Sequence, residues 1–152
     1  MKKVILILLV LINIISCKST DTDFTKSDLN SVSLYDYDNK LITLEEIANQ
    51  WNERIQENEE IDARITQLEI TNLIDQITNK NELILLGNTN RESVKTATKL
   101  TKFKNGLKLN EISVTCKNCD SELNIKLNSG NWSCLSSDDI DSCTKIETMR
   151  GL

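Results

Sequence analysis

The apolar residues of this 152-residue chain change their spacing partway along it, and this change constrains the fold more than any other feature. Between Leu44 and Ile55 they recur every three or four residues, as on one face of a helix. After Gly87 they tend to alternate with polar residues, as in half-buried strands. The chain is therefore expected to form helices first and strands afterwards.

The clearest helical segment begins at Thr43. Thr43 and Glu46 have the spacing of a capping box, in which each side chain accepts a hydrogen bond from the other residue's backbone amide. One apolar stripe follows, made of Leu44, Ile47, Ala48, Trp51 and Ile55. Trp51 is expected to pack in the core rather than bind a ligand. Residues 61–77 also have apolar side chains at helical spacing with one slip near Glu69, which fits one bent helix or two short ones.

Strand signals begin at residues 82–86. This run is apolar on both faces, which favours a central strand, and Gly87-Asn88 is expected to end it. Further on, Lys104-Asn105-Gly106 predicts a three-residue turn with the glycine in the left-handed position. Such a turn would set Phe103 opposite Leu107.

Beyond that turn we expect an antiparallel meander. A change of phase near Asn110-Glu111 predicts a bulge. Ser129-Gly130 predicts a second hairpin turn, and the meander would place Val114 opposite Leu123. Together these patterns predict an α+β fold, in which N-terminal amphipathic helices pack on a C-terminal antiparallel β-meander.

The start of the chain has the build of an export signal. Lys2 and Lys3 give a positive start, and Val4 to Ile15 is apolar except at Asn13. A helix over this run would be about 18 Å long, too short for the roughly 30 Å hydrocarbon core of a bilayer. The run ends in Ile14-Ile15-Ser16-Cys17, where a small residue precedes a cysteine. This segment resembles the lipobox of bacterial lipoproteins.

The resemblance implies a lipid anchor at Cys17. In that family the thiol accepts a diacylglycerol, the bond between Ser16 and Cys17 is cut, and the new amine is acylated. Two or three acyl chains anchor a protein stably to a membrane. In the lipoproteins of many Gram-negative bacteria an Asp after the cysteine favours retention in the inner membrane, so the resemblance implies that Lys18 favours the outer membrane, facing the periplasm or the surface. The expected organisation is a signal peptide (1–16), a lipidated tether (17–33) and a single α+β domain (34–152).

Four cysteines remain in the expected domain: Cys116, Cys119, Cys134 and Cys143. An even number in an exported domain predicts two disulfides. Zinc binding and redox chemistry are the alternatives, because Cys116 and Cys119 form a CxxC pair. However, the other two cysteines are not close in sequence, and the CxxC is expected on a turn. If Cys134 lies opposite Ile125, it is about 7 Å from Cys116. The expected pairing is therefore Cys116 with Cys119, and Cys134 with Cys143.

Composition excludes several classes of function. The chain has no histidine, which removes Ser-His-Asp and Cys-His catalysis and histidine pH switches. The formal charge of −5 becomes −7 without Lys2 and Lys3, and such an acidic chain lacks the basic footprint that nucleic acids or anionic lipids need. Asp138, Asp139 and Asp141 lack the order of a calcium loop. We expect no metal, no cofactor and no nucleic acid partner.

These features indicate a binding protein rather than an enzyme. The expected role is a lipid-anchored cell-envelope lipoprotein that presents a small acidic, disulfide-bonded domain to a protein partner, as immunity proteins and subunits of envelope complexes do. One alternative is a structural envelope protein. Another is a thiol-disulfide oxidoreductase using Cys116 and Cys119, but the chain lacks the proline that thioredoxin-type enzymes place opposite their cysteines.

Overall fold

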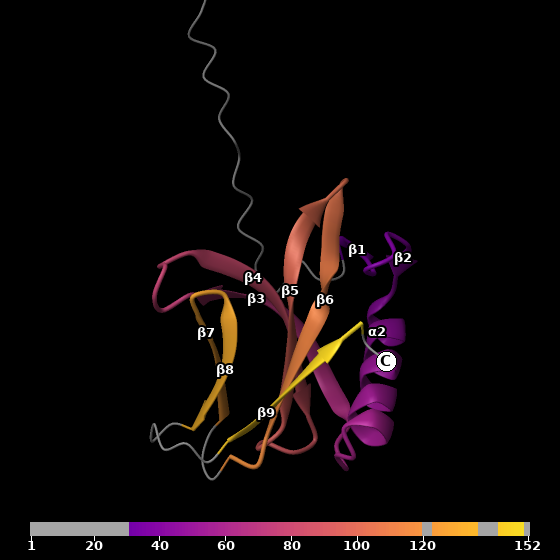
Figure 1. The fold of residues 1–152 in the computed structure, drawn as a ribbon. Coiled ribbons are helices and arrows are strands. Elements are labelled where there is room, and N and C mark those ends of the chain that lie inside the picture. The colour runs from indigo at the N-terminus through magenta and orange to yellow at the C-terminus, as the bar shows by residue number, and fades with distance from the viewer. Residues whose placement is uncertain (1–30, 120–122, 137–142, 151–152) are drawn as a thin grey trace, which may run out of the picture.

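The computed structural model describes residues 31–119, 123–136 and 143–150 (Figure 1). Within them one helical segment occurs, formed by the α-helix α2 (Leu44–Glu53) and the continuous π-helix η1 (Arg54–Asn58). The strands are β1 (Ser33–Tyr35), β2 (Leu41–Ile42), β3 (Ile65–Ile74), β4 (Asn81–Thr89), β5 (Lys95–Phe103), β6 (Gly106–Lys117), β7 (Leu123–Asn128), β8 (Asn131–Ser136) and β9 (Thr144–Met149). The prediction of an α+β fold with helices packed on a meander is therefore wrong, because the domain is mostly β.

The strands form one curled sheet and one separate hairpin (Figure 1). The sheet has seven strands in the order β2-β1-β6-β5-β4-β3, and β9 also pairs with β6. β1 runs parallel to β6, whereas the other pairs are antiparallel. α2 packs on one face of the sheet, and the β7–β8 hairpin packs on the opposite face. The sheet is therefore the middle one of three layers.

β6 contacts three other strands. One of its edges pairs with β5, and its other edge pairs first with β1 and then with β9. The register with β5 shifts between Thr98 and Leu100, which leaves extra residues on β6 at positions 110–112. The Thr98 hydroxyl donates to the carbonyl oxygens of Asn110 and Ile112 at 3.2 and 2.8 Å. This confirms the bulge predicted at Asn110-Glu111.

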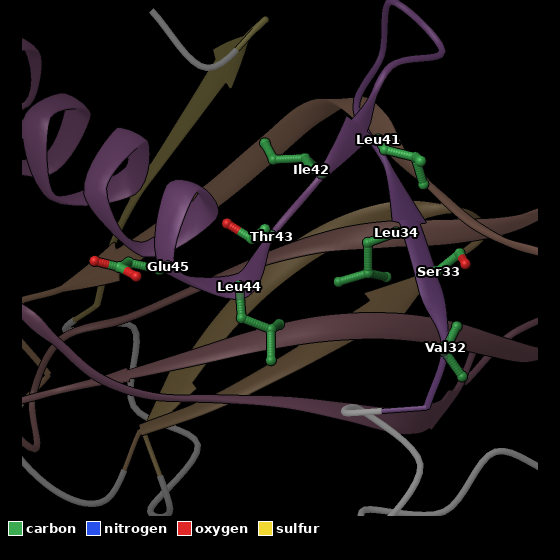
Figure 2. A pocket seen from close by; sticks show the side chains of 8 residues that line it. All are labelled: Val32, Ser33, Leu34, Leu41, Ile42, Thr43, Leu44 and Glu45. Atoms are coloured by element: carbon green, nitrogen blue, oxygen red, sulfur yellow. The ribbon is translucent and has the colours of Figure 1, made fainter.

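The β1–β2 hairpin leads directly into α2 through Thr43 (Figure 2). The Thr43 backbone amide donates to the Glu46 carboxylate at 2.8 Å, and the Glu46 amide donates to the Thr43 hydroxyl at 3.2 Å. Hydrogen bonds from the Thr43 backbone and hydroxyl hold the pKa of Glu46 below its usual value. The predicted capping box is therefore confirmed.

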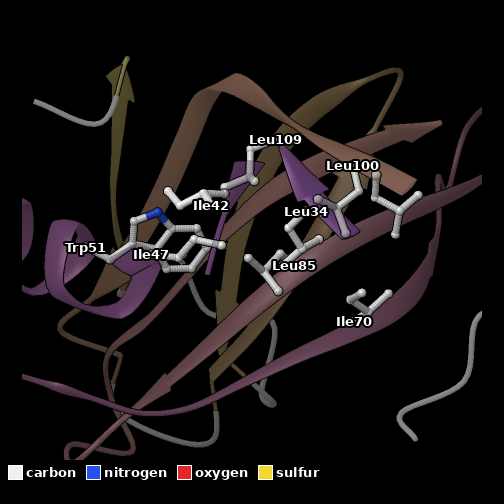
Figure 3. Packing of buried hydrophobic residues seen from close by; sticks show 9 residues of the cluster. Leu34, Ile42, Ile47, Trp51, Ile70, Leu85, Leu100 and Leu109 are labelled. Carbon is white, nitrogen blue, oxygen red and sulfur yellow. The ribbon is translucent and has the colours of Figure 1, made fainter. Parts of the chain in front are cut away.

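The first hydrophobic cluster lies between α2 and the sheet (Figure 3). Its buried members are Leu34, Ile42, Ile47, Trp51, Ile70, Leu85, Leu100, Leu107 and Leu109. Trp51 is a core residue, as expected. Gly87 lies inside β4 and does not end it, since it pairs with Leu68 and Thr96. A Cβ at this position would lie 2.9 Å from the Ile65 side chain and 3.0 Å from the Trp51 ring. The indole therefore occupies the space that a side chain at Gly87 would take.

The prediction of helices over residues 61–77 is wrong, because β3 occupies Ile65–Ile74 and pairs with β4. Five of its ten residues are β-branched, which favours a strand: Ile65, Thr66, Ile70, Thr71 and Ile74. Leu68 and Ile70 pack on the first cluster, whereas Leu73 packs on the opposite face. Apolar residues on both faces of one strand produced spacings that imitate a helix.

The turn between β5 and β6 has two residues, Lys104 and Asn105, rather than the three predicted. Phe103 therefore lies opposite Gly106 and not opposite Leu107. The residue with positive φ is Lys104, at 50°. A Cβ at Gly106 would clash with the carbonyl oxygen of the first β1 residue. A glycine is therefore needed at position 106 for the close pairing of β1 with β6, and not for the turn.

The second hydrophobic cluster joins the β7–β8 hairpin to the sheet. Its buried members are Ile84, Ala97, Val114, Cys116, Cys119, Leu123, Ile125, Leu127 and Trp132. The predicted turn at Ser129-Gly130 and the pairing of Cys134 with Ile125 are confirmed. The predicted pairing of Val114 with Leu123 is wrong, because β6 pairs with β9 while β7 and β8 leave the sheet.

Asp75 ties the far end of the β3–β4 hairpin to the turn of the β7–β8 hairpin. Its carboxylate accepts hydrogen bonds from the backbone amides of Ile77, Thr78, Ser129 and Gly130, at 2.6 to 3.0 Å. These bonds, first those from Thr78 and Gly130, hold the pKa of Asp75 well below its usual range. The folded state therefore stabilises the charged carboxylate of Asp75 more than the unfolded chain does.

We predict that Asp75→Asn lowers the free energy of unfolding at pH 7, because the amide cannot accept all four hydrogen bonds. Since the folded pKa of Asp75 is lowered, its contribution is complete above its unfolded pKa of about 3.9 and declines as the pH falls below that value. Urea unfolding should therefore show a difference in the free energy of unfolding between wild type and Asp75→Asn at pH 7, and this difference should be smaller at pH 3. The control is Asp62→Asn, at an exposed surface ion pair with Arg91. A gap of equal size at both pH values would contradict the assignment.

Candidate functional site

Two disulfides hold the segments after β6 against its end. Cys116 on β6 is bonded to Cys134 on β8, with Cα atoms 5.6 Å apart. Cys119, just after β6, is bonded to Cys143, just before β9, with Cα atoms 4.4 Å apart. The prediction of two disulfides is confirmed, but the expected pairing of Cys116 with Cys119 and of Cys134 with Cys143 is wrong.

The pairing differs because the β7–β8 hairpin is not a neighbour of β6 within one sheet. It lies on the face of the sheet, so Cys134 approaches Cys116 across the gap between two layers. The expected separation of about 7 Å assumed that both residues shared a single sheet. Cys116 is fully buried, and Cys116 and Cys119 are not bonded to each other. Each cysteine of the CxxC motif therefore belongs to a different disulfide.

Several predicted features fall outside what the structure describes. Ser16 and Cys17 lie outside the described residues, so the lipid anchor stays a prediction. Asp138, Asp139 and Asp141 also lie outside them. Among the residues that are described, no group of three or more metal-ligating side chains is close enough to hold an ion. In the same residues no helix is both long and apolar enough to cross a bilayer.

A buried ion pair links η1 to the sheet. Arg54 is fully buried, and its Nε lies 3.2 Å from Oε1 of Glu59. Its Nη2 donates to the hydroxyl oxygens of Thr96 and Thr115 on β5 and β6, at 2.5 and 3.5 Å. The hydroxyl of Thr148 on β9 donates to Glu59 at 2.9 Å. The network therefore joins the helical layer to three strands.

Burial lowers the pKa of Arg54, and the Glu59 carboxylate opposes that shift. The guanidinium carbon also lies 5.3 Å from the centre of the Trp51 ring. All these partners belong to the folded domain, and the charged groups are almost fully shielded from solvent. The network therefore fixes η1 to the sheet, and within it Arg54 Nη1 and Glu59 Oε2 are buried without a hydrogen-bond partner in the described part of the chain.

An open apolar groove lies beside β1 (Figure 2). It has a volume of about 550 Å³ and is lined by Val32, Ser33, Leu34, Leu41, Ile42, Thr43, Leu44 and Glu45. Leu41 is 69% exposed at its rim. Its lining contains one carboxylate, that of Glu45, and the hydroxyls of Ser33 and Thr43, and the other lining side chains are apolar.

Aromatic and basic side chains gather at the tip of the β5–β6 hairpin. We call this group the hairpin cap: buried Tyr35, half-buried Phe103 and Lys108, and exposed Lys104. The rings of Tyr35 and Phe103 meet edge to face, with centroids 5.0 Å apart. The Lys104 Nζ lies 5.1 and 5.0 Å from the two ring centres, and the Lys108 Nζ lies 5.7 Å from that of Phe103. The Tyr35 hydroxyl donates to the Asn105 side chain at 2.9 Å.

The hairpin cap belongs to a basic segment in an acidic chain. Residues 93–110 contain five lysines and no Asp or Glu: Lys95, Lys99, Lys102, Lys104 and Lys108. Residues 44–62, which form α2, η1 and the chain after them, contain seven acidic residues and one Arg. The net charge of the chain does not show that its basic and acidic residues lie in different segments. A count of charge along the sequence would have revealed it.

Comparison of the chain with protein-family models, with curated proteins and with solved structures gave no match. The disulfides, the charge separation and the hairpin cap therefore carry the functional argument.

We predict that tryptic digestion of the oxidised protein will reveal the disulfide pairing. Cleavage after Lys108, Lys117, Lys126 and Lys145 yields peptides 109–117, 118–126 and 127–145. The pairing in the structure joins all three into one species. Bonds of Cys116 to Cys119 and of Cys134 to Cys143 would instead leave peptide 127–145 separate. A second protease that cleaves before aspartate, at Asp138, Asp139 or Asp141, separates Cys134 from Cys143. The masses of the products then show which cysteine each of the two is bonded to.

The same bonds should contribute to stability. Closing a loop with a sequence separation of 18 residues contributes about 3 kcal/mol in the chain-entropy account. The Cys116→Ala/Cys134→Ala variant should therefore unfold at a temperature lower by about 10 °C or more, measured by circular dichroism. An unchanged melting temperature would show that this bond does not stabilise the domain.

Proposed function

We propose that this chain is a lipid-anchored lipoprotein of the bacterial cell envelope whose disulfide-bonded domain binds a protein partner without catalysing a reaction. The observation that carries the proposal is the pair of disulfides in the described domain. Disulfides persist in oxidising compartments outside the cytosol. They agree with the export signal and the lipobox-like Ile14-Ile15-Ser16-Cys17 in the sequence. In this proposal the anchor holds the domain on the outer membrane.

The acidic helical segment is the surface that we assign to the partner. Six of its carboxylates are exposed: Glu45, Glu46, Glu53, Glu57, Glu60 and Asp62. The seventh, Glu59, is buried against Arg54. An exposed field of one sign steers a partner of opposite charge and rejects one of like charge. A basic protein surface therefore fits this side of the domain, as expected for an immunity-like protein or a subunit of an envelope complex.

An oxidoreductase is the weaker candidate. It would use Cys116 and Cys119 as a dithiol, but each is bonded to a different, more distant cysteine. Cys116 is also fully buried, so a substrate thiol has no direct access to it. Both observations favour a structural role for the cysteines.

The anchor is tested by Cys17→Ala in cells. We expect the variant to leave the detergent-soluble membrane fraction and to lack the mass of the acylated N-terminus, because no thiol is available for the diacylglycerol. Lys18→Ala is the matched control, since it preserves the small residue and the cysteine, and it should stay membrane-bound. Unchanged partition and unchanged N-terminal mass for Cys17→Ala would refute the anchor.

The partner surface is tested by photo-crosslinking in cells from position 57 on η1, with position 80 in the β3–β4 loop as the reference. We expect a discrete adduct from position 57 that decreases when Glu53 and Glu60 are both changed to Lys. The control reverses half-buried Glu82 and exposed Glu92, which lie elsewhere on the domain and carry the same charge. An adduct that both double variants reduce equally would reflect net charge rather than this surface.

A further inference from the structure

We propose that the hairpin cap docks on the phosphate-bearing anionic headgroups of the bilayer that holds the anchor. The inference rests on the proposed anchoring at Cys17 and adds a second, direct contact between the folded domain and the membrane. It assigns the hairpin cap to the lipid and leaves the η1 end of the domain for a protein.

The first argument is where the described domain begins. β1 starts at Ser33, and Ser33 pairs with Gly106, the first residue after the β5–β6 turn. The chain from Cys17 therefore joins the domain at the hairpin cap. Ser31 follows Cys17 by fourteen positions, which span at most about 50 Å. An anchor at Cys17 thus keeps this end of the domain within reach of the membrane.

The second argument is the distribution of charge along the domain. Thr96, which contacts Arg54, and Phe103 are seven residues apart on β5, which corresponds to about 23 Å. The exposed carboxylates that follow η1, such as Glu60, therefore lie far from the lysines of the hairpin cap. The acidic side chains nearer to it are Asp36 and Asp38 in the β1–β2 turn next to Tyr35, and that turn also contains Lys40. An anionic surface attracts the hairpin cap and repels the η1 end, so it favours one orientation of the domain.

The third argument is the chemistry of the side chains in the hairpin cap. Lys104 is exposed and Lys108 is half-buried, and both have their ammonium groups over aromatic rings. Phe103 is half-buried rather than enclosed in a core. An aromatic ring flanked by lysines can contact the headgroup region while the ammonium groups bind phosphates. None of the three hydrophobic clusters among the described residues includes Phe103, whose ring packs against the buried ring of Tyr35.

The experiment uses the chain from residue 17 with Cys17→Ser, so that no lipid anchor contributes to binding. Every hydrophobic cluster described lies within residues 31–150, so this chain retains them. Cosedimentation is measured with vesicles of phosphatidylcholine alone and of phosphatidylcholine with phosphatidylglycerol, at about 20 mM NaCl. We expect binding at least tenfold stronger to the anionic vesicles, and its loss at about 0.5 M NaCl because salt screens the charges.

The decisive variant is Lys104→Glu/Lys108→Glu, which should weaken binding to anionic vesicles by tenfold or more. The matched control, Lys80→Glu/Lys117→Glu, makes the same change of net charge in the β3–β4 loop and at the other end of β6, and should retain most of the binding. Circular dichroism checks that both variants are folded.

Three results would overturn the proposal: no preference for anionic vesicles, equal loss in both variants, or stronger binding to a single-stranded oligonucleotide than to the vesicles. Because this chain has no anchor, failure here leaves the fractionation result for Cys17→Ala intact. The opposite combination is also informative. If the chain binds anionic vesicles as expected but Cys17→Ala leaves membrane partition in cells unchanged, the docking of the hairpin cap is supported and the anchor is refuted.

Discussion

The backbone hydrogen bonds of β6 are the constraint on which the rest of the domain depends. One edge of this strand is filled by β5, and the other is shared between β1 and β9. The bulge near Asn110 lies where the second edge changes partner, since β1 pairs up to Lys108 and β9 pairs from Ile112. A bulge bends and twists a strand. It therefore allows one strand to hold the first and the last described strands in one curled sheet.

Each face of this sheet is covered by a layer that is too small to be stable alone, and polar contacts fix both layers in position. The helical layer is joined to β5, β6 and β9 through Arg54 and Glu59. The β7–β8 hairpin is fixed at its turn by Asp75 and at its other end by the bond between Cys116 and Cys134. An isolated two-stranded hairpin is at best marginally stable in water. Fixing both of its ends compensates for its size.

The sequence predicted local features of this fold better than its layers. The capping box at Thr43, the bulge near Asn110 and the turn at Ser129-Gly130 depend on a few neighbouring residues, and all three were predictable. The helical assignment of residues 61–77 failed because both faces of β3 are partly covered, so its apolar residues do not simply alternate. Gly87 was mistaken for a turn because its actual role, making room for Trp51, depends on a contact distant in sequence.

The same limit explains the candidate site. The four cysteines could be identified as disulfide partners from their number, but their pairing depended on whether β7 extends the sheet or packs on its face, and no local pattern distinguishes these arrangements. Net charge is limited in a related way, since the formal charge of −5 is the sum of a basic hairpin and an acidic remainder and does not show where either lies. A charged partner responds to the nearest groups, because charges beyond about 10 Å are largely screened at moderate salt. For a domain whose η1 end and hairpin cap are about 23 Å apart along β5, each end is therefore recognised on its own.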